Sequence, residues 1–134
     1  MSTDFSTRWA WAEVHTGIIQ DNVALIAQRV APAQVWAVVK ANAYGHGAIP
    51  VAQAAIAGGA TGLCVALVDE GVALRRAGIM VPILLLSEQP IELAELIVGY
   101  HLTPTISSTR AAAALAAAAN AADRTIDVHI KVDT

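Results

Sequence analysis

The sequence predicts an α/β fold in which successive strand–helix units build a parallel sheet. Short apolar runs recur at intervals of about 20–27 residues, the usual length of a strand followed by a helix. Segments with helical spacing and helix-capping residues lie between those runs. The chain has 134 residues, of which 56% are hydrophobic and 14% charged, so it can bury a core as one domain. This composition excludes intrinsic disorder.

Five apolar runs are predicted to be the strands of the sheet. Their nearly continuous apolar character is typical of parallel strands that are covered on both faces. The runs are Gln34–Lys40, Thr61–Val68, Val81–Ser87, Leu102–Ser107 and Thr125–Val132. Ahead of them, Arg8–Val14 is predicted to be a leading strand, with Trp9 and Trp11 on one face.

Helices are predicted before and between these strands. A leading helix over Thr16–Val30 has apolar residues at helical spacing. Further helices are predicted at Ala48–Ala57, Asp69–Ala77, Ile91–Val98 and Thr109–Asp123. Asp69 and Ser108 are expected to cap two of them. The alternation fits either an open doubly wound sheet or the leading part of a (β/α)8 barrel, which needs about 250 residues in full.

Composition and charge exclude several classes of function. A net charge of −3 argues against a nucleic-acid partner. The single cysteine, Cys64, excludes a disulfide framework and a cysteine-based zinc site, and the four histidines lack metal-ligand spacing, so we expect no metal. The charge-free stretch 41–68 is long enough to span a membrane, but its five glycines and Pro50 indicate loop, helix and strand instead. Without a signal peptide, we expect a soluble cytoplasmic protein.

Lys40 is the residue most suggestive of chemistry. It ends the first predicted strand of the repeat, and α/β folds place their active sites at the carboxyl ends of strands. A desolvated amine there can attack an aldehyde and form a Schiff base, the chemistry on which pyridoxal phosphate (PLP) enzymes rest. By position alone, a lysine that ends a strand by reaching solvent is the commoner case.

The residues around Lys40 favour the chemical interpretation. The run Val38-Val-Lys-Ala-Asn-Ala-Tyr-Gly-His-Gly47 resembles the lysine motif of the alanine racemases over ten consecutive residues. The similarity extends to Trp11–Val14, Val65–Gly71 and Ile130–Thr134, which resemble other segments of that family. Amino-acid decarboxylases and PLP-homeostasis proteins share the barrel, but their strand-end lysine sits in a different context.

The resemblance implies a partial PLP-binding (β/α)8 barrel of the TIM type, roughly its first half. Residues 1–30 would form a leading strand and helix, and residues 31–134 successive strand–helix units. The family's C-terminal β domain has no counterpart in these residues. We therefore expect a fragment that is inactive by itself.

The resemblance also implies an isomerase that interconverts L-alanine and D-alanine for peptidoglycan precursors. The complete enzyme is expected to be a homodimer, since the family's second base is a tyrosine from the partner's C-terminal domain. The alternative is a PLP-binding homeostasis protein without racemase activity.

Three residues are implied as site residues. Lys40 would hold PLP and act as the base on one face of the substrate Cα, and the Tyr44 hydroxyl would reach the cofactor phosphate. The alternative for Tyr44 is packing on the barrel rim. Lys131 lies on the polar face of an alternating strand and would point into the barrel. In many racemases the lysine of this motif is carbamylated. The alternative is an exposed lysine near the end of the sequence.

Overall fold

The computed structural model describes residues 11–132. The strands are β1 (Trp36–Val38), β2 (Gly62–Val65), β3 (Ile83–Leu85), β4 (Thr105–Ile106) and β5 (His129–Ile130). The helices are α1 (Thr16–Val30), α2 (Lys40–Tyr44), α3 (Ala48–Ala57), α4 (Val68–Arg76), α5 (Ala94–Gly99) and α6 (Thr109–Ala121), with a 3-10 turn η1 (Ile91–Leu93) before α5. Each predicted strand of the repeat therefore contains an observed one.

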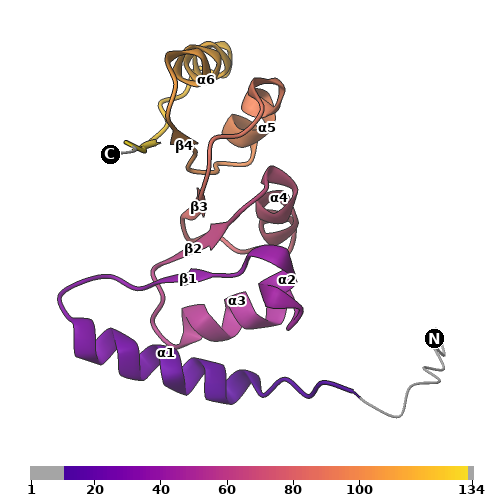
Figure 1. The fold of residues 1–134 in the computed structure, drawn as a ribbon, viewed down its shortest axis with the longest axis vertical. Helices are drawn as coiled ribbons and strands as arrows, with labels where there is room; N and C mark the ends of the chain where they lie inside the picture. The colour runs from indigo at the N-terminus through magenta and orange to yellow at the C-terminus, as the bar shows by residue number, and fades with distance from the viewer. Residues whose placement is uncertain (1–10, 133–134) are drawn as a thin grey trace.

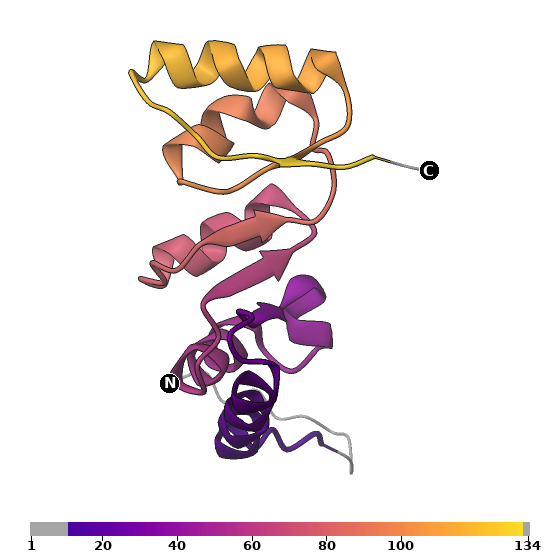
Figure 2. The ribbon, with the colours of Figure 1, turned by 90° about the vertical axis from the view of Figure 1, so that its left-hand side faces the viewer.

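The strands lie side by side in chain order, and all of them are parallel (Figures 1 and 2). β2 pairs with β1 and with β3, and β5 pairs with β4. A bridge between Leu84 and Thr103 joins the two groups, with the Thr103 N–H donating to the Ile83 carbonyl at 2.8 Å. A doubly wound sheet reverses its strand order at a switch point. Here the strand order does not reverse, as in a barrel. Of the two predicted architectures, the structure therefore confirms the leading part of a barrel.

One face of the strands is covered by helices and holds the core. Leu63, Val65, Ile83 and Leu85 alternate with residues of the other face and are fully buried. They form one apolar cluster with residues of α3, α4 and α5, such as Leu74. Figure 1 shows α4 and α5 along one side of the stacked strands.

The opposite face of the strands is open. We call it the open face and define it by Trp36, Val38, Leu84, Leu86 and His129, which the two-residue alternation and the register place together. Val38 is 40% exposed and Leu86 38%. The rings of Trp36 on β1 and His129 on β5 lie 6.3 Å apart between centroids. Because these strands are first and last in the order, the contact shows that the strands curl around the open face.

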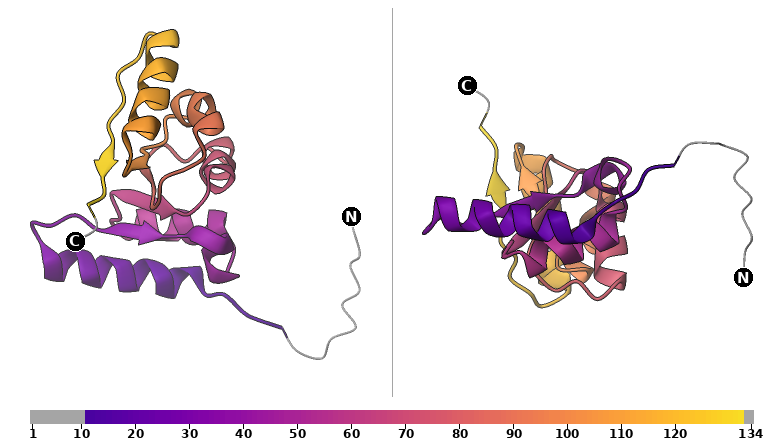
Figure 3. Two further views of the ribbon diagram at one scale, coloured as in Figure 1. Left: turned by 45° about the horizontal axis from the view of Figure 1, so that its top comes forward. Right: turned by 90° about the horizontal axis from the view of Figure 1, so that it is seen from below.

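Helix α1 packs against α3 at the end of the molecule next to β1 (Figure 3). Gly58, which follows α3, lies against α1: a Cβ there would be 2.9 Å from the Val23 Cβ. The glycine therefore permits the close approach of the two helices. The outer side of α1 carries exposed Ile18, Leu25 and Ile26.

Several predicted boundaries are confirmed and others are wrong. Helices α1 and α3 begin and end at the predicted residues, and Ser108 caps α6 by accepting the Ala111 N–H at 3.1 Å. The predicted cap at Asp69 is wrong, because α4 begins at Val68 and Glu70 accepts the N–H groups of the preceding residues.

The predicted leading strand at Arg8–Val14 is wrong for the part that the structure describes. Residues 11–14 are not in a strand, and Trp11 is 84% exposed, since no described strand lies beside them to accept their hydrogen bonds. Trp9 lies outside the described residues. Among the described residues, none of the helices is both long and apolar enough to cross a bilayer.

Candidate active site

The candidate site lies at the carboxyl end of β1, where the chain turns sharply. Lys40 follows the last paired residue, Val39, whose N–H donates to the Cys64 carbonyl on β2 at 2.9 Å. The next residues, Ala41 to Tyr44, all have φ between +51° and +54°. With Lys40 they form the short turn α2, labelled in Figure 1, whose backbone is left-handed from Ala41 onward. Left-handed helical backbone costs about 1–2 kcal/mol for each non-glycine residue.

Hydrogen bonds from outside the turn hold this unfavourable conformation. The Glu70 carboxylate accepts the Ala41 N–H at 2.6 Å, and the Asn42 side chain accepts the Ala48 N–H at 2.8 Å at the start of α3. His46 Nδ1 lies 2.9 Å from the Ala43 carbonyl. The turn ends at Gly45, where φ of +89° suits a residue without a side chain. The turn is therefore fixed by its neighbours on both sides.

Lys40 and Tyr44 are the two ends of this single turn. Lys40 is half-buried, Tyr44 is 61% exposed, and between them Ala43 is buried against the core. The arrangement places a primary amine and a phenol hydroxyl at the carboxyl edge of the strands, next to the open face. An amine can attack an electrophilic carbon, and a hydroxyl can donate a hydrogen bond to an anion.

Lys131 lies directly after another strand of the same curled sheet. It follows β5, and its N–H donates to the Ile106 carbonyl on β4 at 2.8 Å. Its neighbour on the open face, His129, contacts Trp36 of β1. Lys40 thus follows β1 and Lys131 follows β5. Side chains of these two strands meet on the open face, although three strands lie between β1 and β5 in the order.

Two carboxylates that sequence reasoning did not assign to the site organise its edge. One is Glu70. The other is Glu88, after β3, which accepts hydrogen bonds from the N–H groups of Ser107 and Ser108 at 2.6 and 2.8 Å and from both hydroxyls. The N–H of Ser107 and the hydroxyl of Ser108 hold the pKa of Glu88 below its ordinary value. The sequence could have indicated Glu70, because a glutamate in the first turn of a helix often accepts backbone N–H groups at the start of that helix.

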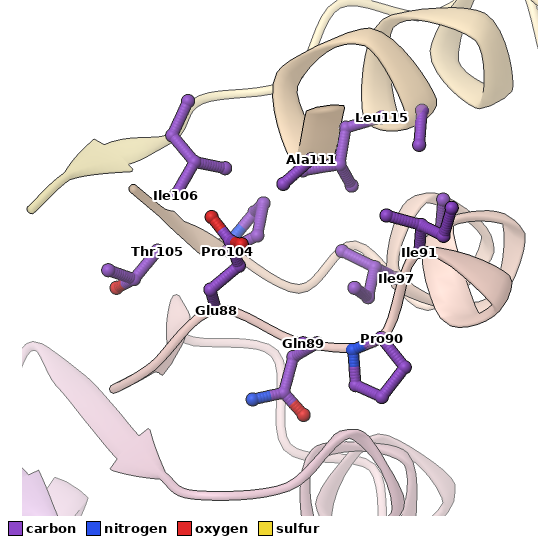
Figure 4. Close-up of a pocket in the computed structure, with 12 residues that line it drawn as sticks. Glu88, Gln89, Pro90, Ile91, Ile97, Pro104, Thr105, Ile106, Ala111 and Leu115 are labelled. Carbon is purple, nitrogen blue, oxygen red and sulfur yellow. The ribbon is translucent and has the colours of Figure 1, made fainter. Parts of the chain in front are cut away.

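Figure 4 shows the surroundings of Glu88. An apolar cavity between α5 and α6 is lined by Ile97, Pro104, Ala111 and Leu115, with Glu88 at its border. Most of its lining is apolar, and the Glu88 carboxylate at its border is already bonded to Ser107 and Ser108, so we interpret this cavity as a packing feature.

The remaining candidates carry no chemistry. Cys64 is buried within β2, and burial raises the pKa of its thiol, which keeps it protonated and unreactive. Within residues 11–132, no group of three or more histidine, cysteine, aspartate or glutamate side chains is arranged to hold a metal ion.

Comparison with known families and proteins identifies the relatives of this chain. Residues 14–134 match the family model described as "Alanine racemase, N-terminal domain". The chain is similar to the alanine racemase of Desulfovibrio desulfuricans, at 44% identity over 128 residues, which are 95% of this chain and 34% of the relative. The alanine racemase of Carboxydothermus hydrogenoformans is 42% identical over 127 residues, again 95% of this chain and 34% of the relative.

Solved structures agree with these relatives. The alanine racemase of E. faecalis superimposes with a TM-score of 0.83 at 41% identity, over 90% of this chain and 33% of that one. The enzyme of Streptomyces coelicolor A3(2) gives a TM-score of 0.82 at 36% identity, over 88% and 32%. The chain thus spans about a third of the length of the relatives it matches.

Proposed function

Because this chain belongs to the alanine racemase family, we propose that it supplies the PLP-anchoring part of an enzyme that interconverts L-alanine and D-alanine. The observation that carries the proposal is the turn α2, which presents Lys40 and Tyr44 together at the carboxyl edge of a curled parallel sheet. Parallel α/β folds bind their ligands at this edge.

The residues at this edge suit PLP chemically. Lys40 would hold the cofactor through its ε-amino group, and the Tyr44 hydroxyl would donate a hydrogen bond to its phosphate. Val38 and Leu86 are half-exposed apolar side chains on the open face, and such side chains suit an aromatic ring. When bound, PLP supplies an electron sink that acidifies the Cα–H of an amino acid.

Lys40 would also move the proton. Its neutral Nζ accepts the Cα proton from one face of alanine and, in the reverse direction, returns a proton to that same face. Racemisation needs a second acid–base group on the opposite face. We propose that a homodimer supplies it, in a cytoplasmic enzyme that provides D-alanine for peptidoglycan precursors.

We propose that Lys131 influences the site but takes no part in the transfer of the Cα proton. Lys131 follows β5, and His129 of β5 contacts Trp36 of β1 on the open face. We propose that the Lys131 side chain is carbamylated, as the resemblance implies. A carbamate converts a cation into an anion and an acceptor, which changes what the side chain can bind there.

A chimera tests the proposed function. Residues 14–132 of this chain replace the matching segment of the racemase of Desulfovibrio desulfuricans, and conversion of L-alanine to D-alanine is measured. We expect racemisation by the chimera and its loss when Lys40→Ala is added. A folded chimera that binds PLP but does not racemise alanine would contradict the proposal and favour a PLP-binding protein without racemase activity.

A further inference from the structure

Glu70 joins two strand ends with one carboxylate. Its Oε1 accepts the Ala41 N–H at 2.6 Å, across 29 positions of sequence. Its Oε2 accepts the N–H groups of Ala66 and Leu67 at 2.8 and 3.0 Å. Ala41 begins the left-handed turn after β1, whereas Ala66 and Leu67 follow β2. One side chain therefore accepts hydrogen bonds from three backbone N–H groups that do not take part in the pairing of the strands.

The bond to Ala41 acts on the most strained part of the backbone. Ala41 is the first of four successive residues with positive φ, and it follows Lys40 directly. An anionic acceptor at 2.6 Å is a strong hydrogen bond, of the charge-assisted kind. Without it, the Ala41 N–H has no acceptor within the turn, since the intrahelical bonds of α2 run to later donors such as the Gly45 N–H. The turn then loses the contact that orients its first residue.

We propose that Glu70 is a positioning residue for Lys40: its carboxylate fixes the left-handed turn and thereby the point from which the Lys40 side chain extends. Glu70 acts through the backbone and touches neither substrate nor cofactor in this role. The inference rests on the proposed function of Lys40. It adds that the Glu70 carboxylate determines the position of the Lys40 amine.

The geometry of the three bonds makes a sharp test available. In Glu70→Gln the side chain keeps its shape, but one of its two oxygens becomes an NH2 group, which cannot accept. Because two donors face Oε2 and one faces Oε1, the amide keeps its remaining oxygen toward Ala66 and Leu67 and turns its NH2 group toward Ala41. In Glu70→Asp the charge remains, but the side chain is one methylene shorter and cannot reach both strand ends. The control is Asp69→Asn, at the exposed neighbouring residue, which removes the same charge.

Two measurements on the 134-residue chain separate positioning from general stability. The first is hydrogen exchange of the Ala41 amide by NMR, without PLP. The second is the rate at which PLP and borohydride give a phosphopyridoxyl adduct at Lys40, followed by mass spectrometry. We expect Glu70→Gln and Glu70→Asp to speed Ala41 exchange and to slow labelling of Lys40 by about tenfold each, which corresponds to about 1.4 kcal/mol. Asp69→Asn should change neither.

The outcomes distinguish the inference from the function on which it rests. Unchanged Ala41 exchange in both Glu70 variants overturns the inference, as does Lys40 labelling at the wild-type rate when Ala41 is exposed. If Glu70→Gln fails to fold, judged by its amide spectrum, Glu70→Asp decides. The exchange measurement needs no PLP, so faster Ala41 exchange in the Glu70 variants would support the inference even if the chimera failed to racemise alanine and the proposed function fell.

Discussion

The indole ring of Trp36 occupies the place where a side chain of Gly62 would begin. The two residues are partners in the register of β1 and β2, and a Cβ at Gly62 would lie 2.6 and 2.7 Å from Cε2 and Cε3 of Trp36. The ring also contacts His129 on β5. The absence of a side chain at Gly62 thus lets Trp36 lie across the open face, where it bridges the first and last strands.

Replacing this glycine should destabilise the protein. Gly62→Ala forces the Trp36 ring away from β2, and overpacking of this kind costs about 1–3 kcal/mol. The measurement is urea denaturation, with the midpoint and slope compared with wild type. Gly99→Ala is the control, because a Cβ there meets open space. Equal midpoints for Gly62→Ala and wild type would contradict this account of the open face.

Arg75 ties together the two connections that lead into β3 and β4. Its guanidinium donates to the carbonyls of Ile79 and Val81 through Nη1 at 2.8 Å, to Tyr100 through Nε at 3.0 Å and to His101 through Nη2 at 2.8 Å. Burial lowers the pKa of this guanidinium, which nevertheless stays charged at neutral pH.

Arg75→Lys should therefore lower the free energy of unfolding although it keeps the charge. A lysine ammonium lacks the planar fork that reaches four carbonyls, and each unsatisfied carbonyl costs about 1–3 kcal/mol where it is buried. Thermal unfolding measures the loss, with Arg110→Lys on the exposed side of α6 as control. An unchanged melting temperature in Arg75→Lys would show that the four bonds add nothing to stability.

Glu88 should make stability depend on pH in the acid range. Its pKa in the folded state lies below the ordinary value of 4.5, because the N–H of Ser107 and the hydroxyl of Ser108 favour the carboxylate. A lowered folded-state pKa gives stability that is complete above the unfolded pKa and is lost as the pH falls through the folded one.

The comparison of wild type with Glu88→Gln tests this pH dependence. The difference in melting temperature should favour wild type at neutral pH, stay constant down to about pH 5 and shrink at lower pH. Glu92→Gln, at an exposed position of η1, should show no such change. A difference that persists unchanged into strong acid would argue against the carboxylate as its source.

Tyr44 offers a test of cofactor affinity. Under the proposed function, Tyr44→Phe removes one hydrogen bond to an anionic phosphate, and such bonds contribute about 1.5–3 kcal/mol. We expect PLP binding to weaken by about 10–100-fold, measured from the concentration dependence of labelling at Lys40. Tyr100→Phe is the matched control, since that hydroxyl instead accepts from Arg76 at 3.3 Å. Equal affinity in Tyr44→Phe and wild type would remove Tyr44 from the proposed site.

The elements that the sequence predicted best are those with local signals. α3 lies between Gly47 and the pair Gly58–Gly59, so its ends are marked by residues next to it. The Ser108 cap of α6 is likewise a local hydrogen bond. Strand lengths were less predictable, since a strand extends only as far as its partner. Thr125–Val132 alternates over its whole length, yet β5 covers only His129–Ile130, because β4 beside it is two residues long.

The sequence motif proposes the residues of the candidate site, but it carries no information about their geometry. Lys40 and Tyr44 stand in one motif, but nothing local predicts that four non-glycine residues adopt left-handed backbone. That conformation depends on Glu70, 29 residues away from Ala41. The contact between Trp36 and His129 likewise joins strands far apart in sequence. Such long-range bonds decide the shape of the site, and periodicity carries no information about them.

The most direct test of the central claim uses the fact that the chain has only two lysines, Lys40 and Lys131. The protein is incubated with PLP, reduced with borohydride and weighed intact, and the modified residue is identified by peptide mapping. We predict one phosphopyridoxyl group on Lys40, retained in Lys131→Ala and lost in Lys40→Ala. Labelling of Lys131 or of the N-terminus at the same rate as Lys40, or an adduct that survives Lys40→Ala, would contradict the account.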